Sequence, residues 1–246
     1  MGRVICVANQ KGGVGKTTTA ISLAAGIARS GLRTLLIDLD PQCNATSGVG
    51  QAPSVHHPLV TGESILTTVT PTGFPRLDLL PGCRSFADVE AMAGGDRARR
   101  MTNQLNRETA DYDYVLIDSP PSLGPMTRTA LGWSTDVLMP IQCEYFAMEG
   151  LVRMIDVIRD VMNRPDGRLA FAGIVLTMYD PSLELTVEVE RQVRDFFGEI
   201  VYKTVIPRDV AVSEAPSHGK PIFDYASRSR GARAYTELCL EVMEYV

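Results

Sequence analysis

The sequence predicts an α/β fold, built as a single doubly wound, mostly parallel sheet with helices on both faces. Three observations support this prediction. Short strand-like runs alternate with helical segments along the chain, which is the pattern of parallel strands joined by right-handed crossovers. The strand-like runs are nearly continuously apolar rather than alternating, as expected where both faces are covered. A glycine-rich loop separates the first strand from the first helix, where such sheets bind ligands.

The expected elements can be placed in chain order. Strands are expected at the short β-branched and aliphatic runs Arg3–Ala8, Thr34–Asp38, Leu77–Leu80, Tyr114–Asp118, Val137–Ile141, Ala172–Thr177 and Val201–Val205. Helices are expected where apolar residues recur with helical period, at Lys16–Ser30, Phe86–Ala93, Met101–Thr109, Pro125–Gly132, Glu149–Asn163, Leu185–Phe197 and Gly231–Tyr245. The stretch Gln51–Gly62 is expected to be a loop in which His56 and His57 are solvated. No repeat or linker interrupts the pattern, so residues 1–246 are expected to form one domain.

Composition narrows the class of protein. The chain has 246 residues, 45% of them hydrophobic, and a formal net charge of −5, which disfavours coating nucleic acid by bulk charge. Its five cysteines are scattered without a C-x-x-C pair, as is typical of thiols in a reducing cytosol. The first strand begins too close to Met1 for a signal peptide, and the longest apolar runs are strand-sized. A cytoplasmic protein without a membrane span is therefore expected.

Residues 9–18 read NQKGGVGKTT and indicate phosphate binding. The run follows an apolar strand and opens a helix, the context in which backbone N–H groups and the positive helix end hold phosphate. Glycine is needed because a Cβ would block close approach and disfavour positive φ. Lys16 is expected to contact the β- and γ-phosphates, and the Thr17 hydroxyl is expected to bind Mg²⁺. The predicted nucleotide contacts are Lys11, Gly12, Gly13, Val14, Gly15, Lys16, Thr17 and Thr18.

The loop departs from the ordinary phosphate-loop pattern, G-x-x-x-x-G-K-[ST]. The first glycine of that pattern would fall at Gln10, and a second lysine, Lys11, stands at the mouth of the loop. The run K-G-G-x-G-K-[ST] resembles the deviant Walker A loop of the ParA/MinD family of ATPases. This resemblance implies a single P-loop ATPase domain. It also implies that ATP drives homodimerisation, with Lys11 reaching across the interface to the partner's nucleotide and acting in catalysis together with Lys16.

Two further strands end in carboxylates at the same edge of the sheet. The second strand leads into the run D-x-D-P-Q-x-N-A, beginning at Asp38, which looks like the second acidic motif of the ParA branch. The resemblance implies that Asp40 orients the attacking water and that Asp38 lies close to Lys16 and the Mg²⁺ shell. The strand Tyr114–Asp118 has a Walker B pattern, so Asp118 is expected to hold Mg²⁺ through water, because Mg²⁺ dehydrates reluctantly.

Residues 203–235 extend the resemblance to the Soj type, the chromosomal and short-plasmid form of ParA, and thus to nearly the whole chain. It implies that Pro207, Arg208 and Asp209 lie against the adenine and ribose, with a polar contact there from Thr177. Family members usually carry Asn where this chain has Asp209.

The segment Ser217–Arg233 concentrates positive charge on an acidic chain, with Asp224 as its one acid. ParA dimers of the Soj type bind DNA without sequence preference through basic residues in this region. The resemblance thus implies weak, salt-sensitive phosphate contacts from Lys220, Arg228, Arg230 and Arg233. The family often has Arg at the position of Ala211 and basic residues around Ser182, so DNA binding is expected to be weaker or differently placed. The alternative interpretation is a solvated surface with scattered arginines.

The resemblance as a whole implies a Mg²⁺-dependent ATPase that binds ATP or ADP, associates with the nucleoid, and acts in chromosome or plasmid partitioning with a ParB-like activator. The main alternative is a MinD-like membrane-positioning ATPase, which needs a basic amphipathic C-terminal helix. Here that helix carries Glu237, Glu241 and Glu244, so it is expected to pack on the domain. A nitrogenase-like electron-transfer ATPase needs cluster-binding cysteines, and Cys83 and Cys143 lack the expected surroundings. The second lysine and the D-x-D-P-Q run disfavour a small-molecule kinase or ligase.

Overall fold

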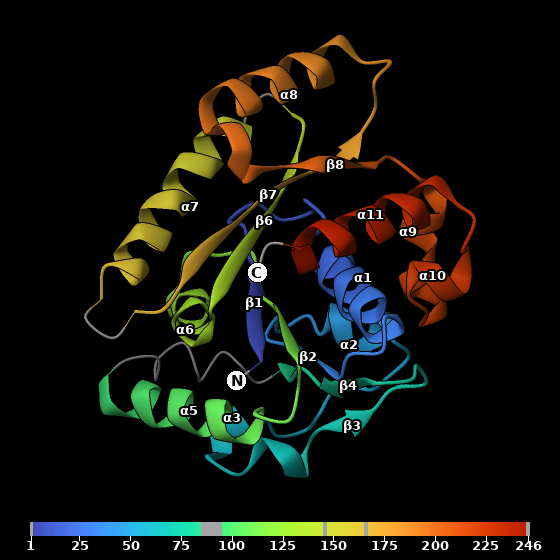
Figure 1. Cartoon of the computed structure of the whole chain (residues 1–246). Coiled ribbons are helices and arrows are strands. Elements are labelled where there is room, and N and C mark those ends of the chain that lie inside the picture. The colour runs from blue at the N-terminus through green and yellow to red at the C-terminus, as the bar shows by residue number, and fades with distance from the viewer. Residues whose placement is uncertain (1, 85–94, 145–146, 165–166, 245–246) are drawn as a thin grey trace.

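The structure has the predicted α/β fold. It is a computed structural model that describes residues 2–84, 95–144, 147–164 and 167–244. Among these residues, one sheet of eight strands runs through the molecule in the order β3-β4-β2-β5-β1-β6-β7-β8 (Figure 1). The strands are β1 (Arg3–Val7), β2 (Thr34–Asp38), β3 (Thr70–Pro71), β4 (Leu77–Leu80), β5 (Tyr114–Asp118), β6 (Asp136–Gln142), β7 (Ala170–Tyr179) and β8 (Val201–Pro207).

Strand pairing brings the expected site residues to one edge of the sheet. Neighbouring strands are parallel apart from β3 and β4, which pair antiparallel. In this register Asp118 lies opposite Val7 on one side and opposite Asp38 on the other. The loop that follows β1 and the two acidic strand ends therefore share the carboxyl edge, where open α/β sheets bind ligands.

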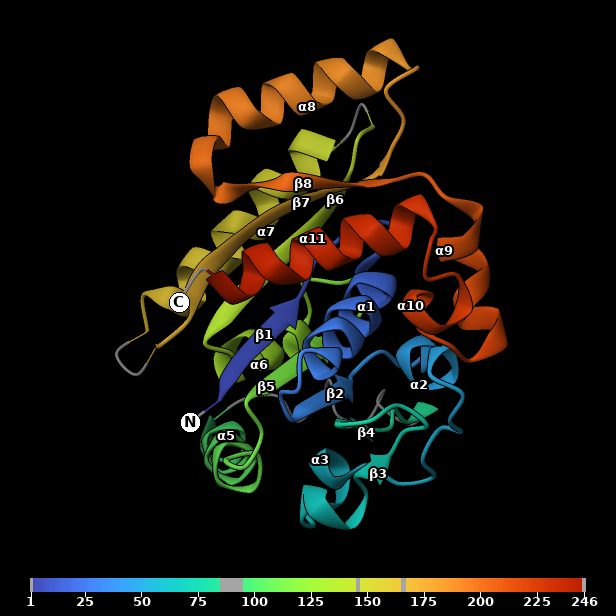
Figure 2. The same ribbon diagram turned by 45° about the vertical axis from the view of Figure 1, so that its right-hand side comes forward.

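Helices cover both faces of the sheet, and each face buries its own apolar core. Figure 2 shows α1 and α11 in front of the strands and α5, α6 and α7 behind them. The first face carries α1 (Lys16–Arg29), α2 (Asn44–Gly48), α9 (Val210–Glu214), α10 (Ile222–Tyr225) and α11 (Arg230–Glu244). The second carries α5 (Gly95–Glu108), α6 (Pro125–Trp133), α7 (Ala147–Met162) and α8 (Glu184–Phe197).

The two cores explain why the strands read as continuous apolar runs. In β1, Val4 and Cys6 belong to the core on the α6 side, whereas Ile5 and Val7 belong to the core on the α1 side. Successive strand residues point to opposite faces, so a strand between two helical layers reads as a nearly continuous apolar run.

The structure corrects the predictions in the irregular segments. The strand β3 and the short helices α2, α9 and α10 were not expected, and the predicted helix Phe86–Ala93 lies outside the described residues. The predicted loop Gln51–Gly62 contains the short helix α3 (Pro58–Thr61). His57 is fully buried rather than solvated, and burial lowers its pKa to about 3. His56 is exposed, as expected.

Two global features agree with the composition. The five cysteines are buried and none forms a disulfide, so they act as small apolar side chains. Within the described ranges, no helix combines the length and the apolar character needed to cross a membrane.

Candidate nucleotide-binding and catalytic site

The phosphate loop joins the end of β1 to the start of α1. Gly13 and Gly15 have φ angles of 75° and 86°, in the left-handed region that favours glycine. The carbonyl of Gly15 accepts the first helical hydrogen bond, from the Thr19 N–H at 2.8 Å. The N–H groups of the first turn of α1 therefore have no partner within the helix and are available to an anion, next to the positive end of the helix.

Lys16 lies in the pocket formed by this loop. Its side chain is buried, and its ammonium donates a 2.8 Å hydrogen bond to the carbonyl oxygen of Lys11. Burial lowers the pKa of Lys16, while the charges of Asp118 and Asp40 raise it. The ammonium is thus held over the loop, where it interacts electrostatically with the carboxylates of Asp118 and Asp40.

Lys11 lies at the exposed mouth of the loop. Its ammonium forms an ion pair with the Glu144 carboxylate at 2.5 Å, and the Gln142 side-chain amide donates to the other oxygen of that carboxylate. The side chains of Lys11 and Glu144 are 40% and 46% exposed, so the pair is accessible to solvent and to a second subunit. Lys11 was expected to reach a partner's nucleotide across a dimer interface, and its ion pair with Glu144 in the same chain was not expected.

Asp118 is the best candidate for holding a metal. It is fully buried at the end of β5, and neither carboxylate oxygen has a hydrogen-bond partner among the described residues. Burial and the charge of Asp38 raise the pKa of Asp118, whereas the nearby Thr17 hydroxyl and the Lys16 ammonium lower it. A buried carboxylate without a donor is costly, so its two free oxygens beside Thr17 fit an Mg²⁺ ion with its bound water.

Asp38 has a different environment from Asp118. One of its oxygens accepts hydrogen bonds from the Thr46 N–H and hydroxyl, at 2.8 and 2.6 Å, and the other accepts from the Asp40 N–H at 3.1 Å. Burial raises the pKa of Asp38 to about 6 against the opposing effect of these bonds. The Thr46 hydroxyl also accepts a 2.8 Å hydrogen bond from the Gly82 N–H. Asp38 therefore organises the segment that follows β2, and a direct contact with metal stays a prediction.

Asp40 lies at the turn between β2 and α2. Its carboxylate accepts a 2.9 Å hydrogen bond from the Gln42 N–H, and its side chain is 6% exposed. This contact uses one carboxylate oxygen in a local turn. The other oxygen remains available for the predicted role in orienting water.

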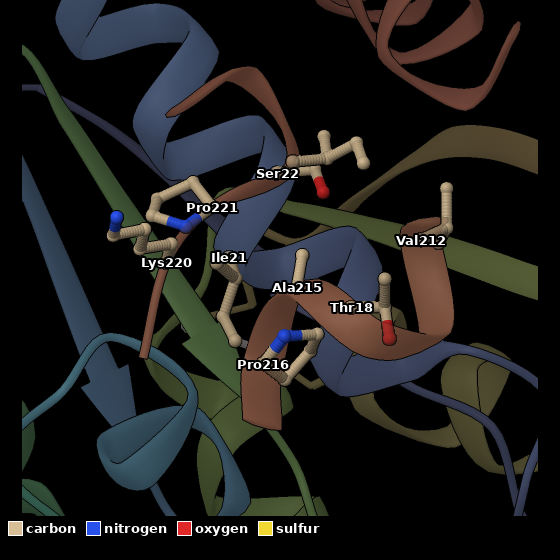
Figure 3. A pocket seen from close by; sticks show the side chains of 9 residues that line it. Thr18, Ile21, Ser22, Val212, Ala215, Pro216, Lys220 and Pro221 are labelled. Carbon is tan, nitrogen blue, oxygen red and sulfur yellow. The ribbon is translucent and has the colours of Figure 1, made fainter. Parts of the chain in front are cut away.

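Thr18 lines a small cavity beside the loop. Figure 3 shows Thr18 and Ile21 of α1 next to Ala215 and Pro216, and Lys220 also lines the cavity, from the segment before α10. The cavity has a volume of about 10 Å³, far less than the roughly 300–1,000 Å³ of typical small-molecule pockets. It joins the start of α1 to the basic segment rather than forming a second ligand site.

The predicted adenine-binding segment begins at Pro207, the last residue of β8. The Arg208 N–H donates to the Tyr179 carbonyl at 3.0 Å. The Asp209 carboxylate caps α9 through the Ala211 N–H at 3.0 Å and also accepts from the Gly231 N–H at the start of α11, at 2.8 Å. Asp209 therefore fixes two helix starts. The adenine contacts of Pro207, Arg208 and Asp209 stay predictions.

The predicted DNA-contacting residues are all exposed or half-buried at the surface. They are Lys220, Arg228, Arg230 and Arg233. Arg230 donates to the Arg208 carbonyl at 3.3 Å, and the acid of this segment, Asp224, forms an ion pair with Arg29 at 3.4 Å. The Arg29 charge thus offsets Asp224, while the Asp180 carboxylate interacts electrostatically with Arg230.

Comparison with known proteins identifies the family. A family model of an AAA domain matches residues 2–171. The sporulation initiation inhibitor protein Soj of Bacillus subtilis is 43% identical over 98% of this chain and 98% of its own length. The chromosome-partitioning ATPase Soj of Thermus thermophilus is 48% identical over 99% of this chain and 96% of its own length.

Solved structures share the fold over the whole chain. A cobyrinic acid a,c-diamide synthase from Mycobacterium smegmatis, with bound ADP and magnesium, is 33% identical with a TM-score of 0.85, covering 100% of this chain and 95% of that one. The cell division ATPase MinD of Pyrococcus furiosus is 25% identical with a TM-score of 0.83, covering 100% of both chains. The resemblance and the enzyme class, an ATPase, are thereby confirmed, and the chain belongs to the Soj/ParA family of ATPases.

Proposed function

We propose that this chain is an ATP-switched partitioning protein. ATP closes two copies face to face, the closed dimer binds DNA without sequence preference, and a ParB-like activator triggers hydrolysis and release. The names of the relatives support a role in chromosome partitioning. The observation that carries the proposal is the exposed Lys11 at the mouth of the site, paired with Glu144 outside the pocket. Residues 1–246 would act as one P-loop domain, in the cytoplasm and on the nucleoid.

The residues of the site divide the chemistry among them. Lys16 and the loop N–H groups would neutralise the phosphates, and a partner's Lys11 would add a second ammonium from outside. Phosphoryl transfer depends mainly on such positioning and charge neutralisation. Thr17 and Asp118 would hold Mg²⁺, which neutralises charge on the phosphate oxygens when bound. The free oxygen of Asp40 would accept a hydrogen bond from the attacking water.

Size-exclusion chromatography with light scattering tests the first step of the proposal. The chain should be monomeric with ADP or without nucleotide, and dimeric with ATP under conditions that prevent hydrolysis. A chain that hydrolyses ATP while it remains monomeric at all concentrations would contradict the proposal.

Replacing Glu144 by Gln should strengthen ATP-dependent dimerisation. In the single chain Glu144 holds Lys11, and closing the dimer has to break this ion pair once in each subunit. An exposed pair is worth about 0.2–1 kcal/mol, so two pairs predict a dimer dissociation constant roughly 2- to 30-fold lower. Sedimentation velocity with ATP measures it. Glu188→Gln removes an exposed ion pair on α8 and should leave the constant unchanged, whereas weaker dimerisation of the Glu144 variant would show that Glu144 does not restrain Lys11.

Removing the basic side chains near the C-terminus should weaken DNA binding in a salt-dependent way. Each basic side chain that contacts a phosphate occurs twice in the dimer, so its removal should lower the log–log salt slope by about 1.8. DNA co-sedimentation with ATP at several salt concentrations measures the slope for alanine variants of Lys220, Arg228, Arg230 and Arg233. Arg159→Ala, which removes an exposed arginine on α7, is the control. Unchanged binding in all four variants would place the DNA surface elsewhere.

The MinD-like alternative is disfavoured by the packing of α11. Its apolar residues Tyr235, Leu238 and Val242 are buried in the core shared with α1. Glu237 is exposed, and Glu241 accepts hydrogen bonds from the β8 backbone. A helix whose apolar side is already buried has little left to insert into lipid. ATP-dependent sedimentation with anionic vesicles but not with DNA would nevertheless favour this alternative.

A further inference from the structure

The start of the phosphate loop is fixed by a buried side chain. Asn9 is 5% exposed; its amide donates to the Pro140 carbonyl at 2.7 Å, and its carbonyl oxygen accepts from the Lys11 N–H at 3.0 Å. Leu138 is the last residue of β6 that pairs with β1, although β6 continues beyond it. At Pro140 the Asn9 amide therefore takes the place of a β1 backbone donor. The loop is thus anchored to β6 where it begins, and to α1 where it ends.

The middle of the loop is anchored by Thr177 of β7. The Thr177 hydroxyl donates a 2.9 Å hydrogen bond to the Val14 carbonyl, and both residues are almost completely buried. Thr177 also provides the nearest atoms, at 3.8 to 4.0 Å, to the place where a Cβ on Gly15 would lie. It shares a strand face with Val175, which belongs to the core on the α1 side. Thr177 therefore packs under the turn that leads into α1.

The hydrogen bond from Thr177 to the Val14 carbonyl also fixes the orientation of the neighbouring Gly15 N–H. The Val14 carbonyl and the Gly15 N–H belong to one planar peptide unit, in which a trans bond points them in opposite directions; the described residues contain no cis peptide bond. A hydroxyl that fixes the carbonyl from the sheet side therefore directs the Gly15 N–H away from the sheet, toward the side where a phosphate would be bound. Without the hydroxyl, a buried carbonyl would lack its partner and the peptide unit could reorient.

We propose that Thr177 is a positioning residue of the ATPase reaction, which aims the Gly15 N–H at the bound phosphates through the Val14 carbonyl. This role differs from the adenine contact that the sequence resemblance implied for Thr177. The loop holds phosphates that ATP and ADP share, so removing the Thr177 hydroxyl should weaken the binding of both nucleotides. The effect should therefore appear in KM and Kd more than in kcat.

Two matched pairs of variants isolate the hydroxyl. Thr177→Val keeps the shape of the wild-type side chain without the donor. Thr177→Ser and Thr177→Ala both lack the methyl group and differ only in the hydroxyl. We expect the Val and Ala variants to bind ATP and ADP roughly 10-fold more weakly than their hydroxyl-bearing counterparts, with kcat changed by less than about 3-fold. Amide exchange of the peptide spanning residues 9–18 should also be faster in both.

Several results would overturn the proposal. One is a Val variant that binds both nucleotides within about 2-fold of the wild type; another is a Ser variant weakened as much as the Ala variant. A lower Tm without nucleotide but an unchanged Kd would assign Thr177 a purely structural role. If the Val variant does not fold, the Ser and Ala pair decides. ADP affinity is measured without a dimer, so the test stands whatever the outcome for dimerisation.

Discussion

Lys16→Ala is expected to abolish measurable ATP binding. The Lys16 ammonium is buried at the phosphate loop, where it is held by the Lys11 carbonyl and lies near Asp118 and Asp40. A lysine about 4 Å from a phosphate oxygen contributes roughly 4 kcal/mol at an effective dielectric constant of 20. Its loss should raise the dissociation constant for ATP about 10³-fold. Isothermal titration calorimetry with ATP and Mg²⁺ measures the change.

Lys11→Ala is the control that separates the two lysines. Lys11 pairs with Glu144 outside its own pocket, so its loss should leave ATP affinity of the monomer within about 3-fold of the wild type while ATP-dependent dimers disappear. If Lys11→Ala weakened ATP binding as much as Lys16→Ala does, Lys11 would act in its own chain. The proposal that each subunit's Lys11 contacts the nucleotide of its partner would then be wrong.

The regular part of the fold could be predicted because its signals are local. A strand between two helical layers is apolar along most of its length, and β1 and β2 show this in the sequence, with their polar residues confined to the strand ends. The element α2 was missed because it has five residues, among them Asn44, Ser47 and Gly48, which are weak helix formers. The helix is held in place by the Asp38 carboxylate, which accepts hydrogen bonds from the Thr46 N–H and hydroxyl. These bonds form only once the fold has brought the two residues together. The strand β3 spans two residues and contains Pro71, too little for a pattern.

The same division holds for the site. The loop glycines, Lys16, Thr17 and Asp118 belong to contiguous motifs, so the sequence alone indicates them. Glu144 and Thr177 reach the loop from positions 133 and 163 residues away in the chain. Glu144 comes just after β6, and the rule that strand ends meet at one edge could have suggested it. The resemblance pointed to Thr177 only as an adenine contact, because a threonine near the end of an apolar strand such as β7 gives no signal of a contact with the loop.

Asp40→Ala is expected to separate ATP binding from hydrolysis. The Asp40 carboxylate has no contact with the loop lysines by hydrogen bond or ion pair among the described residues, so ATP affinity should change by less than about 3-fold. Loss of a group that orients or deprotonates water lowers the rate by roughly 10²–10⁴-fold. Single-turnover hydrolysis measures the rate, and light scattering should show dimers that persist on DNA.

Asp40→Asn distinguishes the two functions that the carboxylate could have. Asparagine can still accept the Gln42 N–H and keep the turn, because its carbonyl oxygen replaces the carboxylate oxygen used there. It lacks the negative charge that would polarise water. We therefore expect Asp40→Asn to hydrolyse ATP as slowly as Asp40→Ala, with the thermal stability of the wild type. Hydrolysis near the wild-type rate in Asp40→Asn would mean that the turn, and not the charge, is what the reaction needs, and the attacking water would then have to be oriented by another group at the same sheet edge.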